Sequence, residues 1–100
     1  MRKSRPRYPR QKEVTLVLRA LEAVPRDVPF RMGWRESEHY VPNWRVQTQT
    51  NEIEWTVDIY AGGYYIVRVG SRLTEEVTSV SSLVGHLCRM LRVQRVSKPV

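Results

Sequence analysis

Residues 43–70, NWRVQTQTNEIEWTVDIYAGGYYIVRVG, contain three runs of alternating apolar and polar residues, the pattern of half-buried strands. A two-residue turn at Thr50–Asn51 and a three-residue loop at Ala61–Gly63 would place the apolar residues of all three runs on one face. A slip of one residue would turn polar groups inward, so the pattern specifies which face is buried. We expect Trp55 at the centre of this face. The full set is Trp44, Val46, Thr48, Ile53, Trp55, Val57, Ile59, Tyr65 and Val67.

The opposite face of this sheet is predicted to be polar, and its central strand carries three carboxylates, Glu52, Glu54 and Asp58. Sheets that bind single-stranded nucleic acids on an open face need basic and aromatic residues there. A metal-dependent nuclease needs several convergent carboxylates, usually with a lysine nearby. We expect instead that these acids form cross-strand pairs with Arg45 and Arg68.

Helical periodicity flanks the three runs. EVTLVLRALEAVP predicts a helix over residues 10–24, and the apolar spacing after Thr74 predicts a second helix over residues 75–92 that begins with Glu75 and Glu76. Residues 26–43 form either a long functional loop or one that contains a short strand near Val28–Trp34. The predicted fold is a single α+β domain over residues 10–92, in the order α-β-β-β-α. Its three-stranded antiparallel sheet has both helices on one face, and basic tails cover residues 1–9 and 93–100.

The predicted order of elements over residues 10–92 resembles the topology of double-stranded-RNA-binding domains. Those domains contact phosphates through a lysine cluster at the start of their second helix. This chain reads LTEEVTS over residues 73–79, with acids where the family has bases. The resemblance therefore concerns the order of elements alone, and many unrelated small proteins share that order.

The net charge of +7 is unevenly distributed along the 100 residues. Residues 13–85 hold seven arginines against ten carboxylates, whereas both ends of the chain are basic. Proline-containing basic ends of this kind typically neutralise phosphates. We therefore expect a nucleic-acid-associated protein, DNA or RNA, that grips phosphates largely without reading base sequence. The predicted phosphate-binding residues are Arg2, Lys3, Arg5, Arg7, Arg10, Lys12, Arg89, Arg92, Arg95 and Lys98.

The alternative is a protein-interaction module, such as a virus- or mobile-element-encoded inhibitor or a subunit of a larger, RNA-containing assembly. Phe30, Trp34 and Tyr40 lie in the long connection and could anchor a protein partner, or could close one end of the core. The oligomeric state is left open.

No enzyme, cofactor, metal or small-molecule substrate is expected, because no catalytic or ligand-spaced set of residues is evident. Glu36, Glu38 and His39 lack a further ligand, and Cys88 falls on an apolar helix stripe. No run approaches the ~20 apolar residues that a membrane span needs. A single cysteine and the lack of a signal-like segment predict an intracellular protein.

Overall fold

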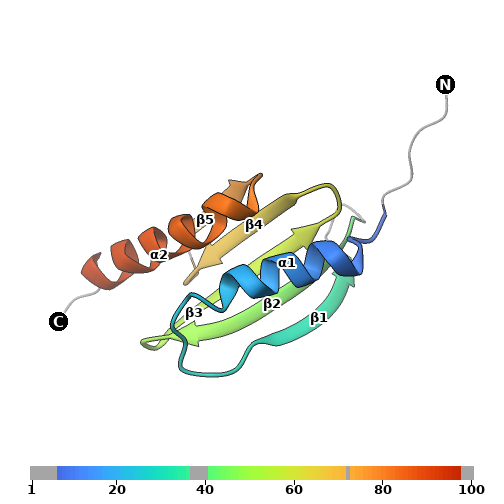
Figure 1. Ribbon diagram of the computed structural model, residues 1–100. Helices are drawn as coiled ribbons and strands as arrows, with labels where there is room; N and C mark the ends of the chain where they lie inside the picture. The colour runs from blue at the N-terminus through green and yellow to red at the C-terminus, as the bar shows by residue number, and fades with distance from the viewer. Residues whose placement is uncertain (1–6, 37–40, 72, 98–100) are drawn as a thin grey trace.

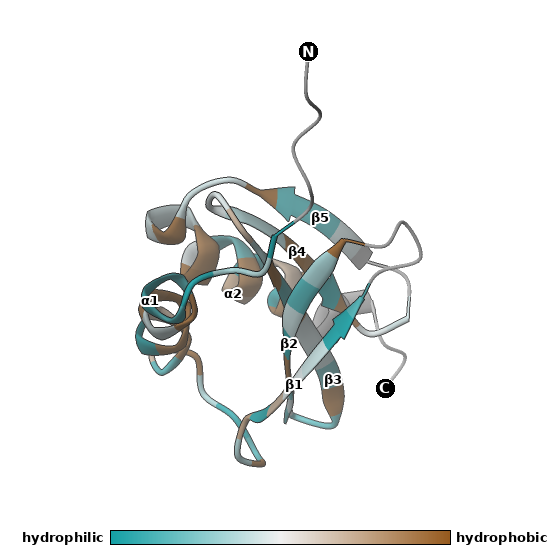
Figure 2. Ribbon diagram, turned by 90° about the vertical axis from the view of Figure 1, so that its right-hand side faces the viewer, coloured by the Kyte–Doolittle hydropathy of each residue, from teal (hydrophilic) through white to brown (hydrophobic). Residues whose placement is uncertain are grey.

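The fold has two layers, with two helices packed on one face of a five-stranded antiparallel sheet (Figures 1 and 2). The computed structural model describes residues 7–36, 41–71 and 73–97. The strands lie side by side in chain order, so every connection is between neighbours. The elements are α1 (Gln11–Leu21), β1 (Arg31–Glu36), β2 (Pro42–Thr50), β3 (Ile53–Tyr60), β4 (Tyr64–Val69), β5 (Leu73–Val77) and α2 (Val80–Ser97). Within these residues, neither helix has the length and apolar character needed to cross a membrane.

The prediction of three strands was wrong, because the sheet gains one strand at each edge. β1 forms in the long connection and pairs with β2, so this connection does contain a strand. β5 occupies residues 73–77, where the start of the second helix was predicted, and α2 begins only at Val80. Pairing with β5 satisfies backbone groups of β4 that would otherwise form a free edge. Glu75 and Glu76, which suggested a helix start, are exposed on this outermost strand.

The two hairpins test the predicted register. The first turn consists of Asn51 and Glu52, and not of Thr50 and Asn51 as predicted, so Thr48 pairs with Trp55. Because this shift is by two residues, the same side chains still face the core. Asn51 and Glu52 both have positive φ, 50° and 66°, as a type I′ turn requires. The loop at Ala61–Gly63 is confirmed, and Tyr60 pairs with Tyr64 across it.

The hydrophobic core lies between the helices and the predicted apolar face of the sheet. Val14, Val17 and Leu21 of α1 and Leu83 and Leu87 of α2 are all fully buried in one cluster with strand residues. The strand members of this cluster share one face, so both helices cover the same side of the sheet, as predicted.

Trp55 is at the centre of this core, as predicted, with 1% of its surface exposed. Its indole N–H donates a hydrogen bond to Oγ1 of Thr50 (2.9 Å), whose hydroxyl donates to the carbonyl of Pro25 (2.6 Å). The ring of Phe30 packs edge-on against Trp55 at 6.0 Å between centroids. These contacts join the connection before β1 to the centre of the sheet.

Candidate nucleic-acid interface

The basic N-terminal segment enters the fold through an aromatic contact with the edge strand β1. The ring of Tyr8 lies 5.2 Å from that of Trp34 between centroids, at an interplanar angle of 47°, and Pro9 next to it is buried. Both rings remain partly open to solvent, since Tyr8 is 54% and Trp34 44% exposed. Trp34 pairs with Trp44 on the helix side of the sheet, where β1 is left largely exposed. The result is a pair of accessible aromatic rings at the start of the helical layer.

Glu13 links the start of α1 to the loop between β3 and β4. The backbone N–H of Arg10 donates to its Oε2 (2.7 Å), and the backbone N–H of Gly62 donates to its Oε1 (2.8 Å). The hydrogen bond from Arg10 is the main reason that the pKa of Glu13 is lowered from its usual 4.5. The carboxylate therefore holds the start of α1 against the β3–β4 loop. Sequence reasoning missed this role, although a glutamate three residues after a helix N-cap is a known signal.

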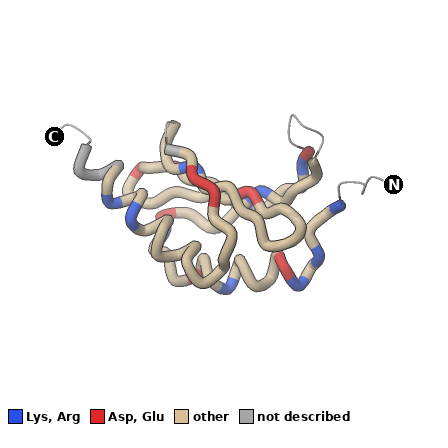
Figure 3. Tube along the Cα trace, turned by 90° about the horizontal axis from the view of Figure 1, so that it is seen from above, with Lys and Arg blue, Asp and Glu red and all other residues tan. Residues whose placement is uncertain are grey.

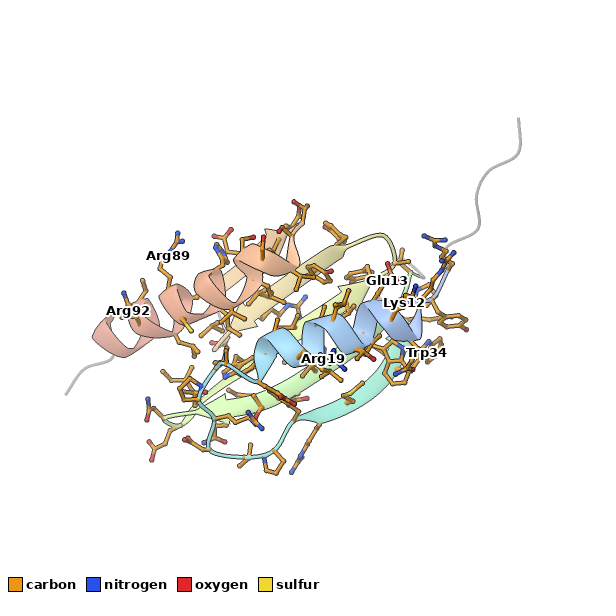
Figure 4. All side chains as sticks on the ribbon, viewed as in Figure 1. Lys12, Glu13, Arg19, Trp34, Arg89 and Arg92 are labelled. Atoms are coloured by element: carbon orange, nitrogen blue, oxygen red, sulfur yellow. The ribbon has the colours of Figure 1, made fainter. Side chains whose placement is uncertain are left out.

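The cations of the helical layer lie on its exposed side. Lys12 and Arg19 are exposed on α1 with Leu16 between them, and Arg89 and Arg92 are exposed on α2. Figure 4 shows Lys12 and Trp34 at one end of the layer, Arg89 and Arg92 at the other, and Arg19 between them. Helix α2 contains three arginines and no carboxylate, and Glu13 is the only acid within α1. The helical layer therefore has an exposed surface that is predominantly basic.

The remaining predicted phosphate-binding residues fall at the ends of the described chain. Arg7 and Arg10 are exposed just before α1. Arg95 lies in α2, which runs through residues 93–97 that the sequence analysis assigned to a tail. Arg2, Lys3, Arg5 and Lys98 lie outside the described residues. In Figure 3, basic positions gather near both ends of the described chain, and these ends lie at opposite sides of the molecule.

The face of the sheet away from the helices, here called the outer face, has a different charge pattern. Arg45 and Asp58 form the predicted cross-strand ion pair, with Nε to Oδ1 at 2.7 Å and Nη2 to Oδ2 at 3.0 Å. The pKa of Arg45 is raised, chiefly by this hydrogen-bonded pairing. Glu54 accepts a hydrogen bond from the side chain of Gln47 (2.8 Å). Asp58 and Glu54 of β3 thus have partners within the sheet, whereas Glu52, expected on the same strand, lies in the β2–β3 turn. The expected pairing with Arg68 is not found among the described residues.

Two of the three predicted partner-binding aromatics, Phe30 and Trp34, lie in different surroundings. Phe30 packs against Trp55 and carries the guanidinium of Arg26 over its ring, 4.2 Å from the centroid. Trp34 lies half exposed beside Tyr8. Tyr40 lies outside the described residues. Phe30 therefore closes the core, whereas Trp34 stays accessible.

Among residues 7–36, 41–71 and 73–97, no group of three or more His, Cys, Asp or Glu side chains is placed to hold a metal ion. Cys88 packs against the core from α2 as a half-buried residue. The chain was compared with protein-family models, curated proteins and solved structures, and none of the three comparisons returned a match. The five-stranded sheet also removes the α-β-β-β-α order on which the likeness to double-stranded-RNA-binding domains depended.

Proposed function

We propose that this protein is a nucleic-acid-associated protein that contacts phosphates through its basic ends and the exposed side of its helical layer, largely independently of base sequence. The observation that carries the proposal is the set of exposed cations before α1, on α1 and on α2. Helix α2 contributes Arg89 and Arg92 to this surface and has no carboxylate. The acids of the α1 region are Glu13, which accepts two backbone hydrogen bonds, and Glu22, which is exposed at the C-cap. Phosphate backbones bind to such basic surfaces by releasing counterions.

The aromatic pair adds support for contact with single strands. Tyr8 and Trp34 expose part of their rings next to Arg7, Arg10 and Lys12, which are also exposed. Proteins that bind single strands combine a basic surface with aromatic rings on which bases stack. In this arrangement the cations hold the backbone and the rings hold one or two bases.

The proposal is tested by fluorescence anisotropy of the full chain with labelled duplex and single-stranded oligonucleotides, from about 50 to 200 mM salt. One variant replaces the six cations of residues 1–12 by glutamine, and a second carries Arg89→Gln and Arg92→Gln. Each lost duplex contact should reduce the slope of log affinity against log salt by about 0.9. Arg68→Gln is the control, because Arg68 is also an exposed cation but lies on the outer face.

The proposal would be refuted if the variant of residues 1–12 and the Arg89→Gln/Arg92→Gln variant both kept the wild-type affinity and salt slope. Loss of affinity in Arg68→Gln equal to that in the other variants would show that net charge alone is responsible. Trp34→Ala separates stacking from phosphate contact: single-strand affinity should fall by about fivefold or more at an unchanged salt slope, while duplex affinity stays constant.

A second candidate function is binding of a protein partner at the edge strand β1. Met32 is 42% exposed and Trp34 44% exposed on this strand, and β1 is an edge of the sheet that the described residues form. An exposed edge with apolar side chains can accept an added strand. Failure to bind any oligonucleotide or unrelated polyanion, together with a partner whose binding is lost in Trp34→Ala, would favour this function.

A further inference from the structure

A hollow of about 200 Å³ lies against β1, and its lining contains three arginines and no carboxylate. The arginines are Arg31, Arg35 and Arg45, and the lining is completed by Met32, Gly33, Trp34 and Gln47. Gly33 pairs directly with Arg45, and Arg31 with Gln47, so these residues share the outer face of the sheet. The hollow is therefore on the side opposite the basic surface of the helical layer.

Gly33 creates the open space in this hollow. Residues two apart on a strand point to the same side, so Gly33 lies between Arg31 and Arg35 and contributes no side chain. A Cβ atom added at Gly33 would have no neighbour within 4 Å. The volume exceeds the ~30 Å³ that one water occupies in the liquid, so a polyatomic ion has room there.

Arg45 is held in a fixed orientation at this site. Its Nε and Nη2 donate to the carboxylate of Asp58, which is only 1% exposed. A guanidinium has five N–H donors, so this pairing leaves those on Nη1 without a partner among the described residues. The side chain of Arg45 is thus already ordered before a ligand binds.

Arg35, which lines the hollow, and Asn43, its pairing partner on β2, both have buried polar atoms without a hydrogen-bond partner among the described residues. Nε of Arg35 is buried and has no hydrogen-bond partner within the described chain. Asn43, directly opposite Arg35, is fully buried, and both polar atoms of its amide are likewise without a partner there. Asn43 does not line the hollow, whereas Arg35 does. Buried polar groups are nearly always hydrogen-bonded, so the unpartnered Nε of Arg35 indicates that a further polar group binds there.

We propose that this hollow binds a phosphate dianion, as the free ion or as the terminal phosphate of a small ester. The charge of Arg45 is balanced by Asp58, whereas Arg31 and Arg35 form no ion pair with any described residue. The two guanidinium groups that lack an ion-pair partner carry two positive charges. A phosphate monoester carries about −1.5 to −2 near neutral pH and therefore balances them more completely than a single carboxylate would. Their planar forks of N–H donors also fit phosphate oxygens in pairs.

The test is an NMR titration of the full ¹⁵N-labelled chain with inorganic phosphate at constant ionic strength. The backbone amides of residues 31–35 and the Nε–H of Arg35 should shift and saturate, and acetate should bind at least about tenfold more weakly. Methyl phosphate is titrated in parallel. Tighter binding of methyl phosphate assigns the site to a phosphate ester, and equal or weaker binding assigns it to the free ion.

Gly33→Val is the decisive variant, because it fills the hollow without removing a charge. Valine favours strands and its Cβ would have no neighbour within 4 Å, so the melting temperature should stay the same or rise. Phosphate affinity should fall by about tenfold or more, and so should that of Arg35→Gln, which removes one charged donor. Gly85→Ala is the matched control, since Gly85 on α2 also has open space around it. It should retain the wild-type phosphate affinity.

Equal phosphate affinity in wild type and Gly33→Val would overturn the proposal, as would shifts confined to residues near Arg7, Arg10 and Lys12. The outcome is independent of the proposed nucleic-acid function, because Gly33→Val leaves every cation of the helical layer in place.

Discussion

Truncation of Trp55 provides the most direct test of the core. Trp55→Ala removes a side chain that is 1% exposed and lies between both helices and the sheet. Such a truncation costs about 3–5 kcal/mol from lost burial and the cavity that remains. A domain of this size has a total stability of about 5–15 kcal/mol, so the loss would be a large fraction of it.

Two further substitutions divide this cost into parts. Trp55→Phe keeps an aromatic ring but loses the hydrogen bond from the indole N–H to Oγ1 of Thr50, and should cost about 1–2 kcal/mol. Trp34→Ala is the matched control, because the same change is made at a residue that is 44% exposed. It should cost about 1 kcal/mol or less.

The assay is urea unfolding followed by circular dichroism at 25 °C, in which a change of midpoint at constant slope reports stability alone. The expected order of stability is wild type, Trp34→Ala, Trp55→Phe and then Trp55→Ala. A cost for Trp55→Ala within about 1 kcal/mol of that for Trp34→Ala would refute the placement of Trp55 at the centre of the core.

Two other predictions concern charged groups. Arg45→Ala leaves the buried carboxylate of Asp58 without its partner and should cost about 3 kcal/mol in urea unfolding, whereas Arg45→Met combined with Asp58→Leu should recover most of this loss. A recovery that fails would show that the pair is needed for more than charge balance. Glu13→Gln tests the pH dependence: because the folded pKa of Glu13 is lowered, its contribution is present above pH 4.5 and is lost as the pH falls through the folded pKa. The variant should therefore melt below wild type at pH 7 and converge with it in acid, and a difference that does not change with pH would contradict the assigned hydrogen bonds.

The sequence by itself determined the buried face of the sheet, the loop at Ala61–Gly63 and the first helix. These features follow from local periodicity. A period of two over residues 43–70 places Trp55 and its neighbours on one face of the sheet, and a helical period places Val14, Val17 and Leu21 on one face of α1. The pairing of Arg45 with Asp58 was also predictable, since both lie on the face that alternation assigned to solvent.

Only the tertiary structure decided the two edge strands and the start of α2. Residues 73–77 have the composition of a helix start, but pairing with β4 supplies backbone hydrogen bonds that local propensity does not include. In the same way, β1 is defined by its pairing with β2, and its own residues are mostly exposed and lack a clear alternation of burial.

The candidate sites depend even more on contacts between distant parts of the chain. The ring of Tyr8, just before α1, contacts that of Trp34 on β1. The carboxylate of Glu13 binds the backbone N–H of Gly62, 49 residues away in sequence. The hollow over Gly33 exists because strand pairing brings Arg45 beside Arg31 and Arg35. Composition located the charges along the chain, but only the packing of helices and strands determined which of them share a surface, because that choice is made by the burial of apolar residues elsewhere.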